Sequence, residues 1–403
     1  MSDQIPPGGC PVRDSEWDPT EPETFGSAQV TYARLRRDNP FPWSEAFGGF
    51  WSATTYDDVV AIARDTETFS TATQNVVPHV PRTARRPPLH YDPPEQTAFR
   101  EVIDPSFRRA EVKALEPRFT AAAETLLDPW LAHGACDYAQ DVAMPYVAQC
   151  FAEYLRVPTE VALRVREIGV RYAFAIQDMD KLAVLAASDE LYAIARDLYD
   201  ADDPGTLVRD LRRAATDPDN AVVTEQTAVA TVRQLIVAGM GAPQAVLGSA
   251  VAHLAQDPNL QDRLRRDRAL LPAAVEELLR LYAPYRVFAR TANRDVEVRG
   301  RLVRAGEPIT LIYPSANRDE TRFDDVDTFR LDRRPNKHLA FGRGAHRCPA
   351  ASMGRSELVI ALDVLLTRTA SFGLDGEVEM MNWLEFGPRS VPLRLVPATE
   401  DAP

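Results

Sequence analysis

The spacing of hydrophobic and polar residues predicts that most of the middle of the chain is helical. Apolar positions recur with the helical period between about residues 97 and 282. Prolines and polar clusters interrupt this pattern near Pro158, Pro204 and 217–220, so we expect helices to end there. The longest periodic run, roughly 221–256, predicts one long helix.

Short strand patterns lie on both sides of this helical region. Residues 41–55 resemble two strands around a Gly-Gly turn, and later candidates are 287–290, 296–298, 308–313 and 391–396. Strands and helices do not alternate, which argues against a doubly wound sheet. We therefore expect one mainly α domain over residues 1–403, with small peripheral β-sheets.

Two segments show neither the helical nor the strand period. Residues 1–25 are predicted to form an irregular lead-in to the domain. Residues 71–94 contain six prolines, and a loop of this length in a compact domain is often functional.

The composition narrows the classes of function. The chain has 46 Lys and Arg against 59 Asp and Glu, a formal net charge of −13, so we expect no nucleic-acid partner. The first residues lack the basic start and apolar core of a signal peptide. No stretch of ~18 apolar residues stands out, so we expect no membrane partner and a cytoplasmic protein.

The densest chemical signal surrounds Cys348. Gly342, Gly344 and Ala345 come shortly before it, and a helical pattern begins shortly after it. Backbone N–H groups at a helix start, and those freed by nearby glycines, favour a thiolate. No other Cys or His clusters with His346 in the sequence to complete a zinc site. A single axial thiolate ligand to a heme iron fits this arrangement best.

The segment resembles the heme-ligand loop of the cytochrome P-450 family, whose pattern is Phe-Gly-x-Gly-x-His-x-Cys-x-Gly. Only the last glycine differs, and the matching positions are Phe341, Gly342, Gly344, His346, Cys348 and Ala350. The resemblance extends over about residues 30–398. It implies the mainly α fold of that family, heme b (iron protoporphyrin IX) and Cys348 as the metal ligand.

A second resemblance concerns three charged residues. Glu277 and Arg280 lie three residues apart on one face of an amphipathic helix at 269–282. In the family, a Glu-x-x-Arg pair on this helix forms a buried network with an Arg upstream of the Cys loop, which corresponds here to Arg333. The resemblance implies a structural role for all three.

The family also binds the two heme propionates through polar side chains. Gln96 and Arg100 match two such positions in the segment HYDPPEQTAFR, although His is commoner than Gln at the first. Arg290 matches a further propionate arginine. Together with His346 and Phe341 of the Cys loop, the resemblance implies that these residues bind the cofactor.

The long helix departs from the family pattern Ala/Gly-Gly-x-Asp/Glu-Thr. Here Gly241 and Ala242 replace the acid and the alcohol that guide protons during oxygen activation. Pro243 lacks an N–H group, so the Gly239 carbonyl is predicted to be free to hold water. Gln244 is a further candidate for proton delivery.

The resemblance also places residues at the substrate pocket. The nearest candidates are Ala238, Arg286, Val287 and Phe288, and further segments are 76–80, 172–176, 237–242 and 383–386. Arg286 is unusual for such a position. It would pair with an anionic substrate group, or else reach solvent or a propionate.

Residues 330–355 contain seven basic residues against one acid, although the whole chain is acidic. A basic face on the thiolate side would attract an acidic electron donor. A ferredoxin is the family's usual donor for a chain without its own reductase domain.

These observations predict a heme-thiolate monooxygenase that oxidises a small-molecule substrate with O2 and electrons from a ferredoxin. The missing acid and alcohol leave a second possibility, a heme-thiolate enzyme that uses peroxide or acts as an isomerase or dehydratase. A third is a heme-binding sensor or scaffold without enzyme activity.

Overall fold

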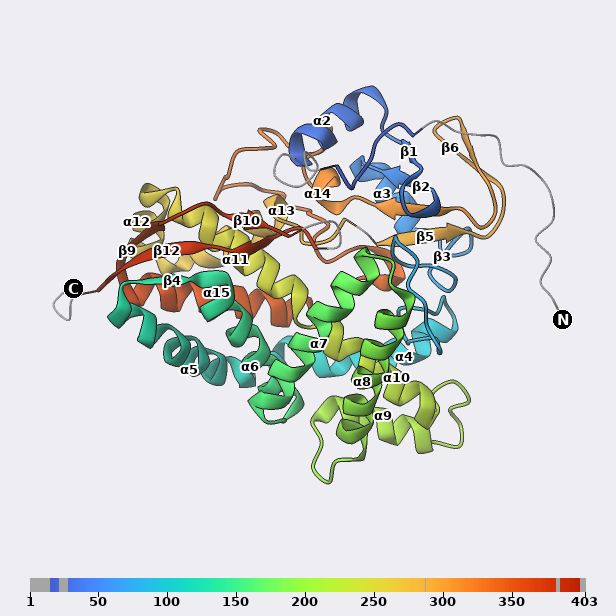
Figure 1. Ribbon diagram of the computed structural model, residues 1–403, viewed down its shortest axis with the longest axis horizontal. Coiled ribbons are helices and arrows are strands. Elements are labelled where there is room, and N and C mark those ends of the chain that lie inside the picture. Colours follow the sequence, from blue (N-terminus) through green and yellow to red (C-terminus); the bar gives the residue numbers. More distant parts are fainter. Residues whose placement is uncertain (1–14, 22–27, 287, 382–384, 399–403) are drawn as a thin grey trace.

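The computed structural model describes residues 15–21, 28–286, 288–381 and 385–398 (Figure 1). Helices make up most of this structure. In chain order they are α2 Ala28–Asp38, α3 Tyr56–Arg64, α4 Glu95–Ile103, α5 Arg109–His133, α6 Met144–Leu155, α7 Thr159–Gln177, α8 Lys181–Asp200, α9 Thr206–Thr216, α10 Glu225–Ala238, α11 Gly241–Ala255, α12 Pro258–Arg266, α13 Leu271–Leu281, α14 Tyr313–Ala316 and α15 Ala351–Arg368.

The strands are short and form small sheets. They are β1 Trp43–Ser44, β2 Phe50–Ala53, β3 Phe69–Ser70, β4 Ala135–Asp137, β5 Ala289–Ala292, β6 Val296–Val298, β7 Arg301–Val303, β8 Pro308–Leu311, β9 Thr369–Leu374, β10 Glu379–Met380, β11 Pro388–Ser390 and β12 Pro392–Pro397. The largest sheet has the order β1-β2-β8-β5-β3, and β4-β12-β9 form a second one. β10 pairs with β11, and β6 pairs with β7.

The first sheet and the helical body form separate regions. Figure 1 shows this sheet at the upper right with α2, α3 and α14, whereas the long helices occupy the lower and left parts of the molecule. In the sheet, β2 runs parallel to β8, and β8 runs antiparallel to β5. This pairing places Arg290 opposite Ile309 in the middle of the sheet.

Local sequence accounts for several helix ends. The side chains of Thr55 and Asp180 accept hydrogen bonds from backbone N–H groups in the first turns of α3 and α8. Asp257 caps α12 in the same way, and Pro258 follows at its first position. Gly134 ends α5 in a left-handed conformation with φ of 82°, which a glycine adopts without strain.

Most predicted boundaries agree with the structure. Helices end and begin around Pro158, Pro204 and 217–220, and the only β pairing in residues 71–94 is the isolated bridge of Val76. The prediction for 296–298 coincides with β6. Those for 308–313 and 391–396 overlap β8 and β12.

Two details differ from the prediction. The strand predicted at 287–290 begins two residues later, at Ala289, and Val287 lies outside the described residues. β4 interrupts the region predicted to be helical, because three residues are too few to show a strand period. Within the predicted lead-in, residues 15–21 have no helix or strand, and Trp17 is buried. The rest of residues 1–25 lies outside the described residues.

The predicted long helix at 221–256 is interrupted. α10 ends at Ala238 and α11 begins at Gly241, with Gly239 and Met240 forming a turn between them. Pro243 therefore lies in the first turn of α11, where its missing N–H group leaves no helical bond unmade. The proline explains why the helix restarts here rather than continuing.

The stretch Glu225–Ala255 is also long and apolar enough to cross a membrane, judged by length and composition alone. Our expectation that no stretch of this kind exists was therefore wrong. Most of this stretch is buried inside the protein. Its position in the core accounts for its apolar composition, as in other fully buried helices.

Candidate active site

Cys348 lies between a tight loop and the start of α15. The loop includes a 3₁₀ turn at Gly344–His346, and the Cys348 N–H donates to the carbonyl of Phe341 at 2.8 Å. α15 begins three residues later, at Ala351. The sequence prediction of a cysteine at a loop-to-helix junction agrees with this arrangement.

Two glycines give the loop its shape. Gly342 and Gly344 have φ of 68° and 73°, values that L side chains rarely adopt. A Cβ on Gly344 would also overlap the carbonyl oxygen of Ala63 at the end of α3. The loop thus packs directly on a helix from the first part of the chain.

The protein alone does not favour a thiolate at Cys348. Burial raises the pKa of this thiol, and this effect outweighs a hydrogen bond from the Ala350 N–H and the cations Arg100, Arg347 and Arg355, which lower it. The backbone donor that we expected is present, but its effect is too small. A metal cation bound to the sulfur would supply the missing stabilisation.

Gln96 and Arg100 of α4 contact the backbone of the Cys loop. Gln96 Nε2 donates to the carbonyl of Ala345 at 2.8 Å, and Arg100 Nη1 donates to the carbonyl of Arg347 at 2.6 Å. Arg100 also forms an ion pair with Asp104 at 2.7 Å. The structure therefore brings both residues to the Cys loop, and their contact with a propionate stays a prediction.

Arg290 is a buried cation that lacks a carboxylate partner among the residues that the structure describes. It donates to the carbonyl of Ala289 at 2.8 Å, and its Nε has no partner. Burial lowers the pKa of Arg290. An unpaired guanidinium in this position is costly unless an anion binds beside it.

His346 lies in the same charged environment. Its Nε2 is 3.2 Å from the hydroxyl of Thr71. Burial, with the cations Arg290 and Arg100, lowers the pKa of His346 to about 3, so the ring is neutral. His346 can donate a hydrogen bond to a carboxylate without adding charge.

These residues fit heme b. Cys348 offers one sulfur ligand, and nowhere in the described parts of the chain do three or more His, Cys, Asp or Glu residues cluster to hold a bare metal ion. The unmatched guanidinium of Arg290 suits a cofactor that carries carboxylates. Phe341 lies in the same loop, with Arg355 over its ring at 4.4 Å.

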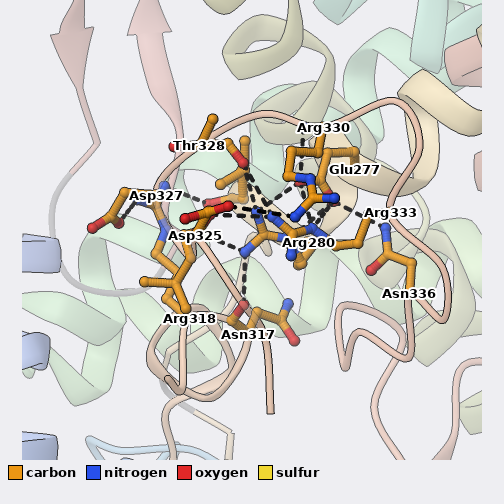
Figure 2. Close-up of polar contacts among 12 residues, drawn as sticks. Glu277, Arg280, Asn317, Arg318, Asp325, Asp327, Thr328, Arg330, Arg333 and Asn336 are labelled. Carbon is orange, nitrogen blue, oxygen red and sulfur yellow. Dashed lines mark hydrogen bonds and ion pairs between the residues drawn. The ribbon is translucent and has the colours of Figure 1, made fainter. Parts of the chain in front are cut away.

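Glu277, Arg280 and Arg333 form the buried network implied by the resemblance (Figure 2). Glu277 accepts from Arg280 at 2.7 and 2.9 Å and from Arg333 at 2.9 and 3.1 Å. Both arginines also donate to backbone carbonyls of residues 317–328. The network ties α13 to the segment that leads into the Cys loop.

The helix break lies at the residues predicted to deliver protons. Gly239 and Met240 form the turn, and Gly241 and Pro243 belong to the first turn of α11. Gln244 is buried, and its Oε1 accepts a hydrogen bond from Arg166 Nε at 2.8 Å. Arg166 comes from α7, so this amide is held from across the fold.

Ala238, Gly239 and Ala242 define the accessible side of the broken helix. Ala238 is exposed and Ala242 is partly exposed, whereas most residues of α11 are buried. This side can therefore face a bound molecule, and a contact of Ala238 with substrate stays a prediction. Phe288 is half-buried and pairs with Val76 of the proline-rich loop in an isolated β-bridge.

Arg286 points into the protein. Its guanidinium is fully buried, donates to the hydroxyl of Tyr32 at 3.3 Å and lies 5.2 Å from the ring of Phe386. These contacts give the side chain a role in packing α2 against the C-terminal segment. A contact between Arg286 and a substrate stays a prediction, and Val287 lies outside the described residues.

Sequence reasoning missed the arginines Arg86 and Arg233, and it missed the contact of Glu385 with Gly241, although both of these residues lie in segments predicted to border the pocket. Arg86 and Arg233 are buried together beside Tyr172, and Glu385 packs against Gly241. Arg86 lies in the proline-rich loop and Tyr172 in a segment predicted to border the pocket. The sequence signal was weak, since a single arginine in a helix or loop is usually a surface residue.

Comparison with known proteins identifies the family. A family model described as cytochrome P450 matches residues 194–369. Nocardicin C N-oxygenase of Nocardia uniformis subsp. tsuyamanensis is 33% identical over 380 residues, which cover 90% of this chain and 94% of the relative. Mycinamicin IV hydroxylase/epoxidase of Micromonospora griseorubida is 31% identical over 357 residues, covering 85% and 89%.

Solved structures agree with these matches. A cytochrome P450 from Chondromyces apiculatus superimposes with a TM-score of 0.83 at 26% identity, over 94% of this chain and 98% of the other. Epothilone D-bound cytochrome P450epoK gives 0.84 at 23% identity, over 95% and 100%, which supports the fold alone. Together with the Cys348 loop and the Glu277 network, these matches show that the chain belongs to the cytochrome P450 family of heme b-dependent monooxygenases.

Proposed function

We propose that this protein oxidises a small organic substrate, by hydroxylation or a similar oxygen transfer, with O2 and electrons from a ferredoxin-type donor. The observation that carries the proposal is the arrangement of Cys348 at the start of α15, with the unpaired buried cation Arg290 close to His346 of the same loop. The relatives' names support oxygen transfer, since one is an N-oxygenase and another a hydroxylase/epoxidase.

Each cofactor-binding residue has a distinct task in this proposal. When bound, heme supplies the redox-active iron at which oxygen is activated. Cys348 ligates the iron and donates electron density to it. The carboxylates of the heme are bound or oriented by four side chains. Arg290 and Arg100 act by charge, and Gln96 and His346 act through neutral N–H groups.

Proton delivery in this proposal does not use a helix acid and alcohol. Pro243 has no N–H group for the carbonyl of Gly239, so this oxygen can bind water at the break between α10 and α11. Gln244, held by Arg166, lies one residue further along and would orient that water. Ala242, which is partly exposed, has only a methyl side chain and leaves room for it beside the accessible face.

The basic face of the thiolate side is proposed to bind the electron donor. Arg334, Lys337 and Arg347 are exposed. By contrast, Arg333 and Arg355 are used internally, by Glu277 and Glu276. The exposed cations would attract an acidic ferredoxin, with an association rate that falls as salt increases.

One set of measurements tests the proposal. Purified protein supplied with heme should give a ferrous carbonyl spectrum with the red shift of a thiolate ligand, and Cys348→Ser should lose that shift. Substrate turnover should then require NAD(P)H with a ferredoxin and its reductase. Lys337→Glu should slow reduction and flatten its salt dependence without changing the carbonyl spectrum, whereas Arg213→Glu, at an exposed position of α9, serves as the control.

The same experiment separates the alternatives. Turnover with peroxide and none with the ferredoxin system would favour the peroxide, isomerase or dehydratase function that Gly241 and Ala242 raise. A thiolate spectrum without turnover or substrate-induced spin shift would favour a heme-binding sensor. We further propose that residues 1–403 act as one heme-thiolate domain in the cytoplasm.

A further inference from the structure

Two arginines with no carboxylate partner lie buried together on the α7, α8 and α10 side of the molecule. Arg233 of α10 is 1% exposed, and Arg86 of the proline-rich loop is 4% exposed. No Asp or Glu forms an ion pair or hydrogen bond with either guanidinium anywhere in the described residues, and the Nε atoms of both lack a partner. Two cations this close are costly to bury without an anion.

The neighbours of the pair are polar but neutral. Arg86 Nη1 donates to the hydroxyl of Tyr172 at 2.8 Å, and Arg233 lies over the Tyr172 ring with its Nη2 donating to Ser188 at 3.2 Å. Burial raises the pKa of Tyr172, but the two arginines outweigh this effect and lower it. Burial, followed by Arg86, lowers the pKa of Arg233 to about 10.

His90 does not balance the charge. Its Nδ1 accepts a hydrogen bond from the N–H of Arg86, and its Nε2 lies 2.8 Å from Asn75 Oδ1, which can only accept. These two contacts fix a neutral tautomer with the proton on Nε2. Burial, followed by the nearby arginines, lowers the pKa of His90 to about 2, which agrees with the geometry.

The pair lies beside segments that are expected to line the substrate pocket. Arg86 follows Val76–Val80 in the same loop, Tyr172 opens the α7 segment expected at the pocket, and Arg233 lies one turn before Val237 on the same side of α10. We propose that Arg86 and Arg233 bind the carboxylate of an anionic organic substrate, an inference that rests on the proposed function. Tyr172 and Ser188 position the two guanidinium groups.

The test compares organic acids with their neutral derivatives. Alkyl and aryl carboxylic acids, each paired with its methyl ester, are titrated into the heme-loaded protein while the spin-state shift is followed. The acids should bind at least about tenfold more tightly than the esters, a difference of about 1.4 kcal/mol. Arg233→Met and Arg86→Gln should each remove this preference, whereas Arg196→Gln, at an exposed position of α8 where Glu225 is its partner, should keep it.

A second measurement does not depend on substrate shape. Acetate and benzoate should raise the melting temperature of the wild type above that in chloride of equal ionic strength, and they should not do so in Arg233→Met. Equal binding of acids and esters, or a preference that survives both substitutions, would overturn the proposal. So would a phenolate absorbance at neutral pH that disappears in Tyr172→Phe, because the pair would then carry its own anion. Failure of the proposed function appears separately, as a missing thiolate carbonyl spectrum.

A different observation concerns the acid missing from position 241. A Cβ on Gly241 would lie 2.7 Å from the carboxyl carbon of Glu385, so the Glu385 carboxyl occupies the space into which an acidic side chain at 241 would project. Glu385 comes from the segment before β11, and Gly387 packs equally closely on Ala245 of α11. The C-terminal segment thus lies directly along the first turns of α11.

The surroundings of this carboxyl are well defined. Burial raises the pKa of Glu385, and the nearby Arg166, which also holds Gln244, lowers it in part. Tyr285 faces it across an isolated β-bridge. The structure assigns to Glu385 the place of the missing helix acid, supplied from another part of the chain. Its carboxyl gives a proton to water at the helix break and takes one back from solvent, so it ends each cycle unchanged.

A swap of the two positions tests this assignment. Gly241→Asp should lower the melting temperature of the wild type, and adding Glu385→Gly should restore it, because the new side chain then has room. The control is Gly169→Asp on α7, whose Cβ would meet open space, and its effect should not depend on Glu385.

Oxygen use provides the functional readout. Glu385→Gln should lower the product formed per NAD(P)H consumed and shift its pH profile, and the swapped double variant should recover the yield. If the changes in melting temperature caused by Gly241→Asp and Glu385→Gly simply add in the double variant, the contact between positions 241 and 385 is refuted. A yield unchanged in Glu385→Gln would assign this residue to packing alone.

Discussion

The protein buries arginines in two regions with opposite electrostatic balance. In the Glu277 network, Arg280 and Arg333 share one carboxylate and donate their remaining N–H groups to backbone carbonyls (Figure 2). Around Tyr172, Arg86 and Arg233 have hydroxyl and aromatic neighbours but no carboxylate among the described residues. The first region is complete in the protein alone, whereas the second is complete only with a bound anion.

This difference separates a structural charge from a binding charge. Removing one member of a satisfied buried network leaves the others unpaired, so stability falls. Removing one of two unsatisfied like charges relieves repulsion, so stability does not fall. The two regions should therefore respond to substitution with opposite signs.

The largest effect is expected in the Glu277 network. Glu277→Gln leaves two buried guanidinium groups without a carboxylate and should lower the free energy of unfolding by about 3–5 kcal/mol. Urea unfolding of the heme-loaded protein measures this loss. Glu190→Gln, which removes the exposed partner of Arg171, is the control and should leave stability nearly unchanged. A loss as small as the control's would contradict the structural role.

Glu357 is a buried acid whose Oε1 has no hydrogen-bond partner. Unlike an arginine, it can lose its charge by taking up a proton. Burial raises the pKa of Glu357 from its ordinary value of 4.5 to about 8. Between these two pH values the folded protein therefore keeps a proton that the unfolded chain has released. Stability should be greatest below about pH 4.5 for this group and fall as pH rises to about 8. Glu357→Gln should remove that slope and stabilise the protein by about 2 kcal/mol at pH 8. Unfolding curves across this range that keep the same slope in the variant would exclude the assignment.

The smallest effect is expected at Arg233, with the reverse sign of the first. Arg233→Met should raise the free energy of unfolding by about 1 kcal/mol in buffer of low anion content, because Arg86 loses a like charge and an apolar side chain fills the space. Thermal unfolding in the presence and absence of benzoate measures this gain, with Arg196→Met as the exposed comparison. A loss comparable to that of Glu277→Gln would place Arg233 among the structural charges.

Sequence predicted the parts of the site that are local in the chain. The Cys348 loop and the Glu277–Arg280 pair depend on short spacings, and the structure brings their residues together as expected. Pro243 predicted a free carbonyl at Gly239, but the division of the long helix into α10 and α11 was not predicted. The contacts of Glu385 with Gly241 and of Arg86 with Tyr172 join distant segments. No local period or motif encodes such pairs. Arginine and glutamate usually lie on the surface, and only tertiary packing decides which of them is buried.

The absence of space at Gly344 has a consequence for protein engineering. Because any side chain there would meet the Ala63 carbonyl at the end of α3, a mutagenesis library over residues 341–350 that tunes the redox potential should hold this position fixed. Grafting the loop from another enzyme would require the matching end of α3 to be transferred with it. The smallest exchangeable unit around the sulfur is therefore a pair of segments and not a single loop.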